Sequence, residues 1–395
     1  MNAGRPLLLS LISLGAPLAA AAQDRFEPVA AQIASIPDSA ERSRAVGSVI
    51  ARVTSSGTPM TTDSTVTLLY RGNARRVFVA GDINGWDPRS DEMTRLAGTD
   101  LFYRSWRLDP AARFEYKLIA DSAWIIDPLN SLRAAGGFGD NSEIRMPRYR
   151  YPVETLTQEG IPRGNIDTVS FASTRLGRRI PLYVYTPAGY SSGSAVYPVL
   201  FVTDGGEYMS RTGLHVVLDN LIARGGIDPL IAVFIDPRTD PGDPRTNTRM
   251  SDYALSDPFV DFLITELRPH LLNGYRIAGS PSGTAILGAS MGGLIATYAA
   301  FMHPEVFGLC AAQSPAYQWA HDTLITMLRS GPRKEFRMYL CTGTMHDAET
   351  RARTVRDIMR GKGYAITYEE YPESHNWMNW RGRLKGILTA FWGKR

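Results

Sequence analysis

One serine lies in a glycine pattern that is typical of an activated nucleophile. Residues 284–288 are mostly apolar, and they lead into Gly288-Ala289-Ser290-Met291-Gly292 and then into small residues that favour a helix. A strand that runs through G-x-S-x-G into a helix forms the strained turn called a nucleophile elbow. Glycine is needed at Gly288 and Gly292 because a side chain would collide with backbone in so tight a turn. We predict that Ser290 attacks a carbonyl carbon; the alternative is a glycine-rich turn with an incidental serine.

A serine hydroxyl needs a base, and His375 is the best placed of the six histidines. It follows an apolar, strand-like segment at residues 365–371 and precedes a final helical pattern. This matches the chain order serine, acid, histidine. The other histidines fall in or beside helical patterns or in a polar segment. We expect His375 to take the proton of Ser290.

The acid that orients the imidazole should follow the preceding strand, residues 336–341. Two carboxylates are available there, Asp347 and Glu349. We predict Asp347 and keep Glu349 as the alternative. Either residue could instead cap the helix that is expected to begin near Ala348.

Acyl transfer also needs N–H donors for the oxyanion. We expect one from the backbone of Met291, directly after the nucleophile, and one from the loop at residues 204–208, where Gly206 is the better candidate. A plain tight turn is the alternative for this loop. No His, Cys and Asp residues have metal-ligand spacing, so we expect neither a metal nor a cofactor.

The elements around these residues indicate an α/β domain. From Ile166 onward, apolar strands alternate with helical patterns, which favours a mostly parallel sheet with helices on both faces. The expected strands are residues 182–185, 199–203, 231–235, 285–288, 309–312 and 338–341, and the clearest helical patterns are 258–272 and 348–360.

The preceding part of the chain has a different rhythm. Short aromatic and β-branched strands, separated by turn formers, predict a small all-β sandwich. Before them, residues 26–53 have helical spacing interrupted at Pro37, and residues 55–59 resemble a linker. The expected strands are residues 66–70, 77–80, 102–108 and 114–119. The predicted organisation is a signal peptide at 1–22, a helical segment and linker at 23–63, the sandwich at 64–150 and the α/β domain at 151–395.

The composition and the N-terminal residues indicate where the protein acts and which partners it has. Arg5 followed by an apolar stretch and Ala20-Ala21-Ala22 is typical of a secretion signal, so we expect the protein in the periplasm or outside the cell, without a membrane span once the signal is removed. The formal net charge of +4 includes no basic run, which argues against nucleic acid as a partner. Cys310 and Cys341 are expected to be buried free thiols, although a bridge between neighbouring strands is an alternative.

Residues 166–392 resemble the putative-esterase family of α/β-hydrolases. This family includes enterochelin esterases, feruloyl and acetyl-xylan esterases, S-formylglutathione hydrolase and mycolyltransferases. The resemblance implies Ser290 as nucleophile and His375 as base. Family members often place the acid three residues after a glycine, where this chain has His346, and Asp347 is one residue later. The matching segments are Val199-Leu200-Phe201-Val202-Thr203-Asp204-Gly205, Leu287-Gly288-Ala289-Ser290-Met291-Gly292-Gly293, Cys341-Thr342-Gly343-Thr344 and His375-Asn376-Trp377 with Trp380.

Residues 66–145 resemble the immunoglobulin-like early-set sandwich related to glycogen-binding modules. The matching segments include residues 78–86, 116–119, 127–128 and 140–141. In glycogen-binding members, the positions that match Trp86, Lys117, Trp124 and Asn141 contact sugar. The same sandwich precedes the catalytic domain of enterochelin esterases, where it does not read glycans, so we expect a packing role.

The resemblance therefore implies a serine ester hydrolase with a Ser-His-Asp triad, and our leading hypothesis is an ester of a siderophore-like polar molecule. A feruloyl or acetyl ester on plant polysaccharide is the second hypothesis. A non-catalytic glycan-binding protein is the hypothesis from another class. The acyl group, the alcohol and the oligomeric state are not encoded in these patterns.

Overall fold

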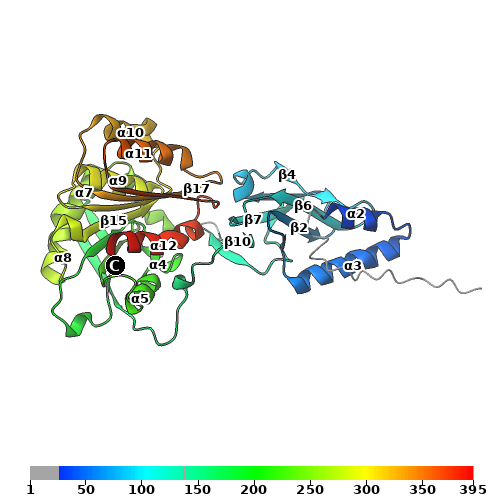
Figure 1. The fold of residues 1–395 in the computed structure, drawn as a ribbon, viewed down its shortest axis with the longest axis horizontal. Coiled ribbons are helices and arrows are strands. Elements are labelled where there is room, and N and C mark those ends of the chain that lie inside the picture. Colours follow the sequence, from blue (N-terminus) through cyan, green and yellow to red (C-terminus); the bar gives the residue numbers. More distant parts are fainter. Residues whose placement is uncertain (1–25, 137–138, 395) are drawn as a thin grey trace, which may run out of the picture. The chain divides into compact units, whose positions relative to one another are not determined.

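The computed structural model describes residues 26–136 and 139–394, which fall into two compact units (Figure 1). The first unit holds the described residues up to Arg133 together with Asp140–Tyr149. The second holds the described residues of Ala134–Gly139 and of Arg150–Arg395. The predicted signal peptide, residues 1–22, lies outside the described residues.

The first unit contains two β-sheets, except that residues 134–136, at the end of the second sheet, belong to the second unit. Strands of the first sheet pair antiparallel, and β3, β7 and β10 of the second sheet are antiparallel neighbours. The four segments that the sequence predicts as strands become β2, β6, β3 and β7. The first sheet has the order β1 (Met60–Thr61), β2 (Thr65–Arg71), β6 (Leu101–Arg107), β5 (Thr94–Arg95). The second has the order β4 (Asp91–Glu92), β3 (Val77–Gly81), β7 (Arg113–Ala120), β10 (Gly139–Arg145), β9 (Arg133–Gly136), with β8 (Ala123–Ile125) beside β7.

Helices α2 (Glu27–Ala34) and α3 (Ser39–Ser56) pack on this unit and share one apolar cluster with its strands. They meet at Pro37, where the helical pattern breaks, and the Asp38 carboxylate caps α3 by accepting the Glu41 N–H at 2.7 Å. The predicted linker begins inside α3, since that helix continues to Ser56. The cluster contains Phe26, Ala30, Ile33, Val46, Val53, Leu69, Leu96 and Leu101.

The second unit is built on an eight-stranded sheet in the described part of the chain. Its order is β11 (Asn165–Ser173), β12 (Arg178–Thr186), β14 (Ile231–Ile235), β13 (Val199–Val202), β15 (Thr284–Ala289), β16 (Leu309–Gln313), β17 (Arg337–Gly343), β18 (Ile366–Tyr371). From β14 to β18 all neighbours are parallel, whereas β11, β12 and β14 pair antiparallel at one edge. The prediction of a mostly parallel sheet in an α/β fold is therefore confirmed.

Helices cover both faces of this sheet, which is why its central strands are apolar on both sides. Phe201 and Ile286 pack in one core cluster with α9 (Met291–Met302), α10 (Trp319–Ser330) and α11 (Glu349–Gly361). Leu200 and Leu287 point the other way, into a second cluster with α5 (Leu214–Ala223) and α12 (Trp377–Trp392). Figure 1 shows these two groups of helices on opposite sides of the sheet.

The remaining helices are α4 (Gly205–Ser210), α6 (Arg249–Tyr253), α7 (Asp257–Asp261) and α8 (Arg268–Gly274). The helix predicted at residues 258–272 is found as one helical run, Asp257–Gly274, in which a π-helical segment, Phe262–Leu267, joins α7 to α8. Pro269 in the first turn of α8 provides the reason: it has no N–H to bond to the preceding turn, and a wider turn relieves its clash.

Both cysteines are free and buried in the sheet. Cys310 lies opposite Met338, and Cys341 lies opposite Gln313, so the two thiols are out of register on neighbouring strands. The alternative of a disulfide bridge is therefore wrong. Within the described residues, none of the helices has the length and hydrophobicity needed to cross a bilayer.

Candidate active site

Ser290 occupies the sharp turn between β15 and α9. Its backbone has φ 56° and ψ −119°, a region that a residue with a side chain adopts only under strain. Gly288 makes the turn feasible, because a Cβ there would lie 2.1 Å from the carbonyl oxygen of Gly292. The geometry is that of the nucleophile elbow expected from the sequence.

The last residue of β16 and the loop after it hold this strained turn from two sides. The N–H of Ser290 donates to the carbonyl oxygen of Gln313 at 2.9 Å, and the N–H of Ala316 donates to the carbonyl oxygen of Ser290 at 3.0 Å. Strained backbone persists only where its surroundings over-determine it. These two main-chain hydrogen bonds supply that constraint.

Asp347 is the carboxylate that meets His375. Its Oδ1 lies 2.6 Å from Nδ1 of His375, while Oδ2 accepts the Ser314 hydroxyl and the Gly343 N–H, each at 2.6 Å. Burial by itself would raise the pKa of Asp347, but the hydrogen bond and charge of His375, with these two other donors, hold it below its usual value. An ionised carboxylate only accepts hydrogen bonds, so Nδ1 carries a proton, and the neutral form of this imidazole has its lone pair at Nε2.

Glu349 does not take this place. It lies in the first turn of α11, whose N-cap residue, Ala348, makes no side-chain capping hydrogen bond. Asp347 therefore does not cap the helix either, because both of its oxygens are engaged at the end of the sheet. Of the two carboxylates considered, the structure brings Asp347 to the imidazole.

His375 is set between Asp347 and a tryptophan. The ring of Trp380 meets the imidazole edge-on, with centroids 5.1 Å apart, and the Trp380 indole N–H donates to the Ser314 hydroxyl at 3.0 Å. Asn376 begins α12 by accepting the N–H of Asn379 at 3.0 Å, which fixes the residue next to His375. The imidazole keeps 38% of its side-chain surface exposed, so it remains open to a reacting group.

The three predicted catalytic residues follow parallel strands of the same sheet. Ser290 comes directly after β15, Asp347 follows β17 and His375 follows β18. Carboxyl ends of parallel strands lie along one edge of a sheet, which is where ligands bind in folds of this type. The topology thus places these residues on the same edge.

Both predicted oxyanion donors lie in the first turn of a helix. Met291 starts α9, whose first helical hydrogen bond runs from the N–H of Leu294 to the oxygen of Ser290. Gly206 is the second residue of α4, which follows β13, the strand paired with β15. N–H groups in a first helical turn have no acceptor within their own helix. They are therefore available to an anionic oxygen.

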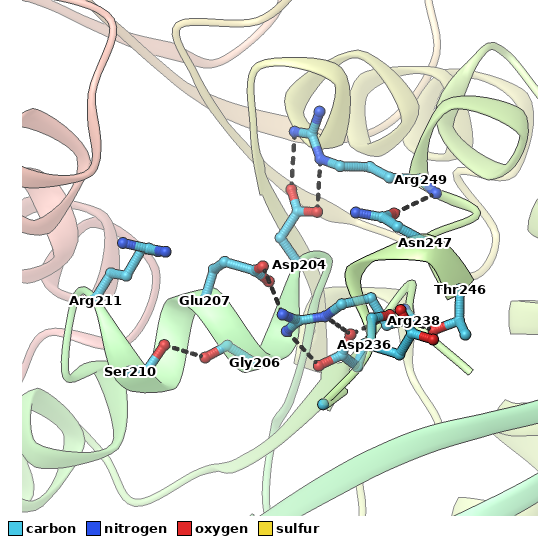
Figure 2. A network of polar contacts seen from close by, with 12 residues as sticks. Asp204, Gly206, Glu207, Ser210, Arg211, Asp236, Arg238, Thr246, Asn247 and Arg249 are labelled. Atoms are coloured by element: carbon cyan, nitrogen blue, oxygen red, sulfur yellow. Dashed lines mark hydrogen bonds and ion pairs between the residues drawn. The ribbon is translucent and has the colours of Figure 1, made fainter. Parts of the chain in front are cut away.

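Ion pairs surround the segment that holds Gly206 (Figure 2). Arg238 bonds to Asp236 at 2.8 Å and lies 3.3 Å from Glu207, and a Cβ on Gly206 would be only 2.3 Å from Oδ2 of Asp236. Arg249 of α6 donates hydrogen bonds to both carboxylate oxygens of Asp204, at 2.7 and 3.0 Å. Sequence reasoning missed these pairs, since no motif marks them.

Ser314 and Gln313 were also missed, although a signal for them exists. Gln313 is the last residue of β16 and Ser314 follows it, and β16 lies between the strands that precede Ser290 and Asp347. The rule that ligand sites gather at the carboxyl ends of parallel strands therefore points to both residues. Among the described residues, no group of three His, Cys, Asp or Glu side chains is arranged to hold a metal ion.

Two of the four candidate sugar-binding residues in the first unit donate hydrogen bonds to carboxylates of the same unit. The Trp86 indole N–H donates to Asp82 at 3.0 Å, and the Asn141 amide donates to Glu115 at 2.7 Å. Lys117 of β7, Trp124 of β8 and Asn141 of β10 lie on adjacent strands, and the pairing register puts them on one face. Trp124 is half exposed.

The chain is similar to proteins of known activity. Residues 173–391, more than half of the chain, match the family described as "Putative esterase". The chain belongs to this family. The Iron(III) enterobactin esterase of Dickeya dadantii is 24% identical to this esterase over 80% of this chain and 82% of its own length. An endo-1,4-beta-xylanase/feruloyl esterase of Xylanibacter ruminicola is 31% identical, over 51% of this chain and 28% of its own.

The fold also has a counterpart among solved structures. The enterobactin esterase of Shigella flexneri, crystallised in the presence of enterobactin, superimposes with a TM-score of 0.71 at 23% identity, covering 84% of this chain and 94% of that one. This likeness supports the fold. Membership of the esterase family makes this protein a hydrolase of carboxylic esters.

Proposed function

We propose that this esterase cleaves its substrate by two-step acyl transfer, with Ser290 as nucleophile, His375 as base and Asp347 as the acid that orients it. The observation that carries the proposal is the 2.6 Å contact between Asp347 and Nδ1 of His375. With Nδ1 protonated, Nε2 accepts the Ser290 proton, and the hydroxyl oxygen attacks the ester carbonyl. The imidazolium then protonates the leaving alcohol, and water releases the acyl group by the same steps.

The oxyanion of each tetrahedral intermediate would be held by the N–H groups of Met291 and Gly206. The first-turn position of each supports this role, because the helix N-terminus adds a favourable dipole to the free donor. Donors of this kind are each worth about 10²–10³ in kcat in serine hydrolases.

We propose a siderophore-like polar ester as the substrate. The Dickeya relative is named for iron(III) enterobactin, and its similarity extends over 80% of this chain. The pattern of residues 1–22 supports action in the periplasm or outside the cell.

A feruloyl ester is the second candidate. The 31% identity to the Xylanibacter enzyme favours it, but this similarity covers only half of the chain. For the first unit, we propose an early-set sandwich with a packing role. The engagement of Trp86 and Asn141 by carboxylates of the same unit supports packing over sugar binding.

Activity on three esters tests the proposal: enterobactin as a siderophore trilactone, methyl ferulate and acetylated xylan. We expect the highest kcat/KM for the trilactone, with turnover lost in Ser290→Ala. A clear preference for methyl ferulate would move the substrate to plant polysaccharide. Failure of the wild-type protein to hydrolyse even p-nitrophenyl acetate would point instead to a glycan-binding protein without catalysis.

A further inference from the structure

A single arginine bridges the two segments that carry the proposed oxyanion donors. Arg249 binds both carboxylate oxygens of Asp204, at 2.7 and 3.0 Å, and its Nη2 also donates to the carbonyl oxygen of Ala289 at 3.1 Å. Ala289 directly precedes Ser290, and Asp204 directly precedes α4, in which Gly206 lies. We call residues 203–207 the oxyanion loop.

Asp204 is shaped for this contact. Its backbone lies in the left-handed region, with φ 51°, and its N–H donates to the Tyr253 hydroxyl at 2.9 Å. The carboxylate reaches toward α9, because a Cβ added to Gly292 would be 3.0 Å from Oδ2 of Asp204. Figure 2 shows the carboxylate directed at the Arg249 guanidinium.

The charge of Asp204 makes its partner important. The carboxyl is buried, and burial raises its pKa, while the ion pair with Arg249 opposes that shift. An unpaired carboxylate beside the start of α9 would repel the negative charge that develops on the oxyanion. Paired with Arg249, it contributes no such net repulsion.

We infer that Arg249 is a positioning residue, which locks the oxyanion loop to the nucleophile elbow and neutralises Asp204 between them. The inference rests on the function proposed above. The planar fork of arginine suits the task, since it can bind a carboxylate with two N–H groups and still donate to a carbonyl; lysine cannot reproduce this geometry.

The test compares Arg249→Gln, Arg249→Lys, Asp204→Asn and the double variant Asp204→Asn/Arg249→Gln in hydrolysis of p-nitrophenyl acetate by the full chain. Displacing a reacting group by about 1 Å can cost about 10²-fold, so we expect Arg249→Gln to lower kcat by about that factor with KM nearly unchanged. The double variant should recover about tenfold of this, because it no longer contains an unpaired buried carboxylate.

Arg178→Gln is the matched control. Arg178 of β12 pairs with the buried Asp252, which lies on α6, the helix of Arg249. Arg178 donates to neither Asp204 nor Ala289 in any described hydrogen bond. We expect this variant to melt at a lower temperature while kcat stays close to wild type. A structural role alone would make Arg249→Gln behave in the same way.

The kcat values of these variants decide whether Arg249 is a positioning residue. Wild-type kcat in Arg249→Gln or Arg249→Lys, or a double variant no faster than Arg249→Gln, overturns the inference while leaving the proposed function intact. If Arg249→Gln does not fold, Arg249→Lys keeps the charge, and about a tenfold loss of kcat is then the supporting result. Substantial activity in Ser290→Ala would overturn the proposed function and the inference together.

Discussion

Nδ1 of His375 and Oδ1 of Asp347 lie 2.6 Å apart, although 28 residues separate them in the chain. The contact joins the loops after β17 and β18, and the second oxygen of Asp347 is already occupied by Ser314 and Gly343. Only one carboxylate oxygen is therefore left for the imidazole. This arrangement fixes the tautomer and the ring orientation that a base for Ser290 requires.

Replacing Ser290 or His375 by alanine should abolish turnover without unfolding the protein. Members of a triad act as a unit, so each loss should cost on the order of 10⁶ in kcat. Hydrolysis of p-nitrophenyl acetate measures the rate, and a thermal melt checks the fold. More than about a tenth of wild-type activity in either variant is incompatible with the assignment.

Asp347→Asn should be far more damaging than Glu349→Gln. The amide keeps the shape of the side chain but cannot stabilise the imidazolium, a change that costs about 10⁴ in kcat in a serine protease triad. Glu349→Gln serves as the matched control, since Glu349 lies in the first turn of the next helix. The reverse ranking of the two kcat values would transfer the role to Glu349, and two mild effects would indicate a Ser-His dyad.

A methyl group at Gly206 should impair catalysis through the oxyanion loop. The new Cβ would lie 2.3 Å from Asp236 and 2.6 Å from Arg238, so either that ion pair or the loop must move. We expect Gly206→Ala to lower kcat by about 10²-fold. Gly361→Ala is the control, because no atom lies within 4 Å of its added Cβ. Equal kcat values for the two variants would remove Gly206 from the site.

The thiols of Cys310 and Cys341 should be inert in the folded protein. Burial raises the pKa of each to about 12, so almost no thiolate exists near neutral pH. A disulfide exchange reagent such as 5,5′-dithiobis(2-nitrobenzoate) at pH 8 should label neither thiol in the native state and both in urea. Rapid labelling of the native protein would contradict this prediction.

The first unit should show no affinity for polysaccharide. Wild type should elute freely from insoluble α-glucan and xylan, because Trp86 and Asn141 already bond to carboxylates of their own unit. Retention that disappears in Trp86→Ala/Trp124→Ala, with small-ester hydrolysis unchanged, would establish sugar binding and favour the carbohydrate-esterase hypothesis.

The sequence was most informative where chemistry is encoded in contiguous residues. The elbow needs only five neighbouring positions, and the alternation of strands and helices predicts where their carboxyl ends lie. The choice between Asp347 and Glu349 could not be made this way, because it depends on the path of one loop. His346 occupies the position where the family often has its acid, and its left-handed backbone, φ 52°, turns the chain so that Asp347 faces the sheet.

Contacts between segments far apart in the chain could not be predicted from the sequence, for a different reason. Arg249 lies in a short helix without a distinctive pattern, and its contact with Asp204 spans 45 residues. The hairpin of β11 and β12 was only half anticipated. Residues 165–173 are partly exposed along an edge strand, so they lack the continuous apolar run by which the central strands are found.

The end of β16 and the loop after it hold Ser290 through two main-chain groups, the carbonyl of Gln313 and the N–H of Ala316. Every residue supplies a carbonyl, and every residue except proline supplies an N–H. The side chain of Ala316 can therefore vary in evolution without loosening the nucleophile, whereas Ser314 is held by its hydroxyl contacts with Asp347 and Trp380. Divergence at Ala316 would be tolerated as long as the path of the main chain is kept, and a mutational scan of the loop should find proline at Ala316 far more harmful than other substitutions at that position.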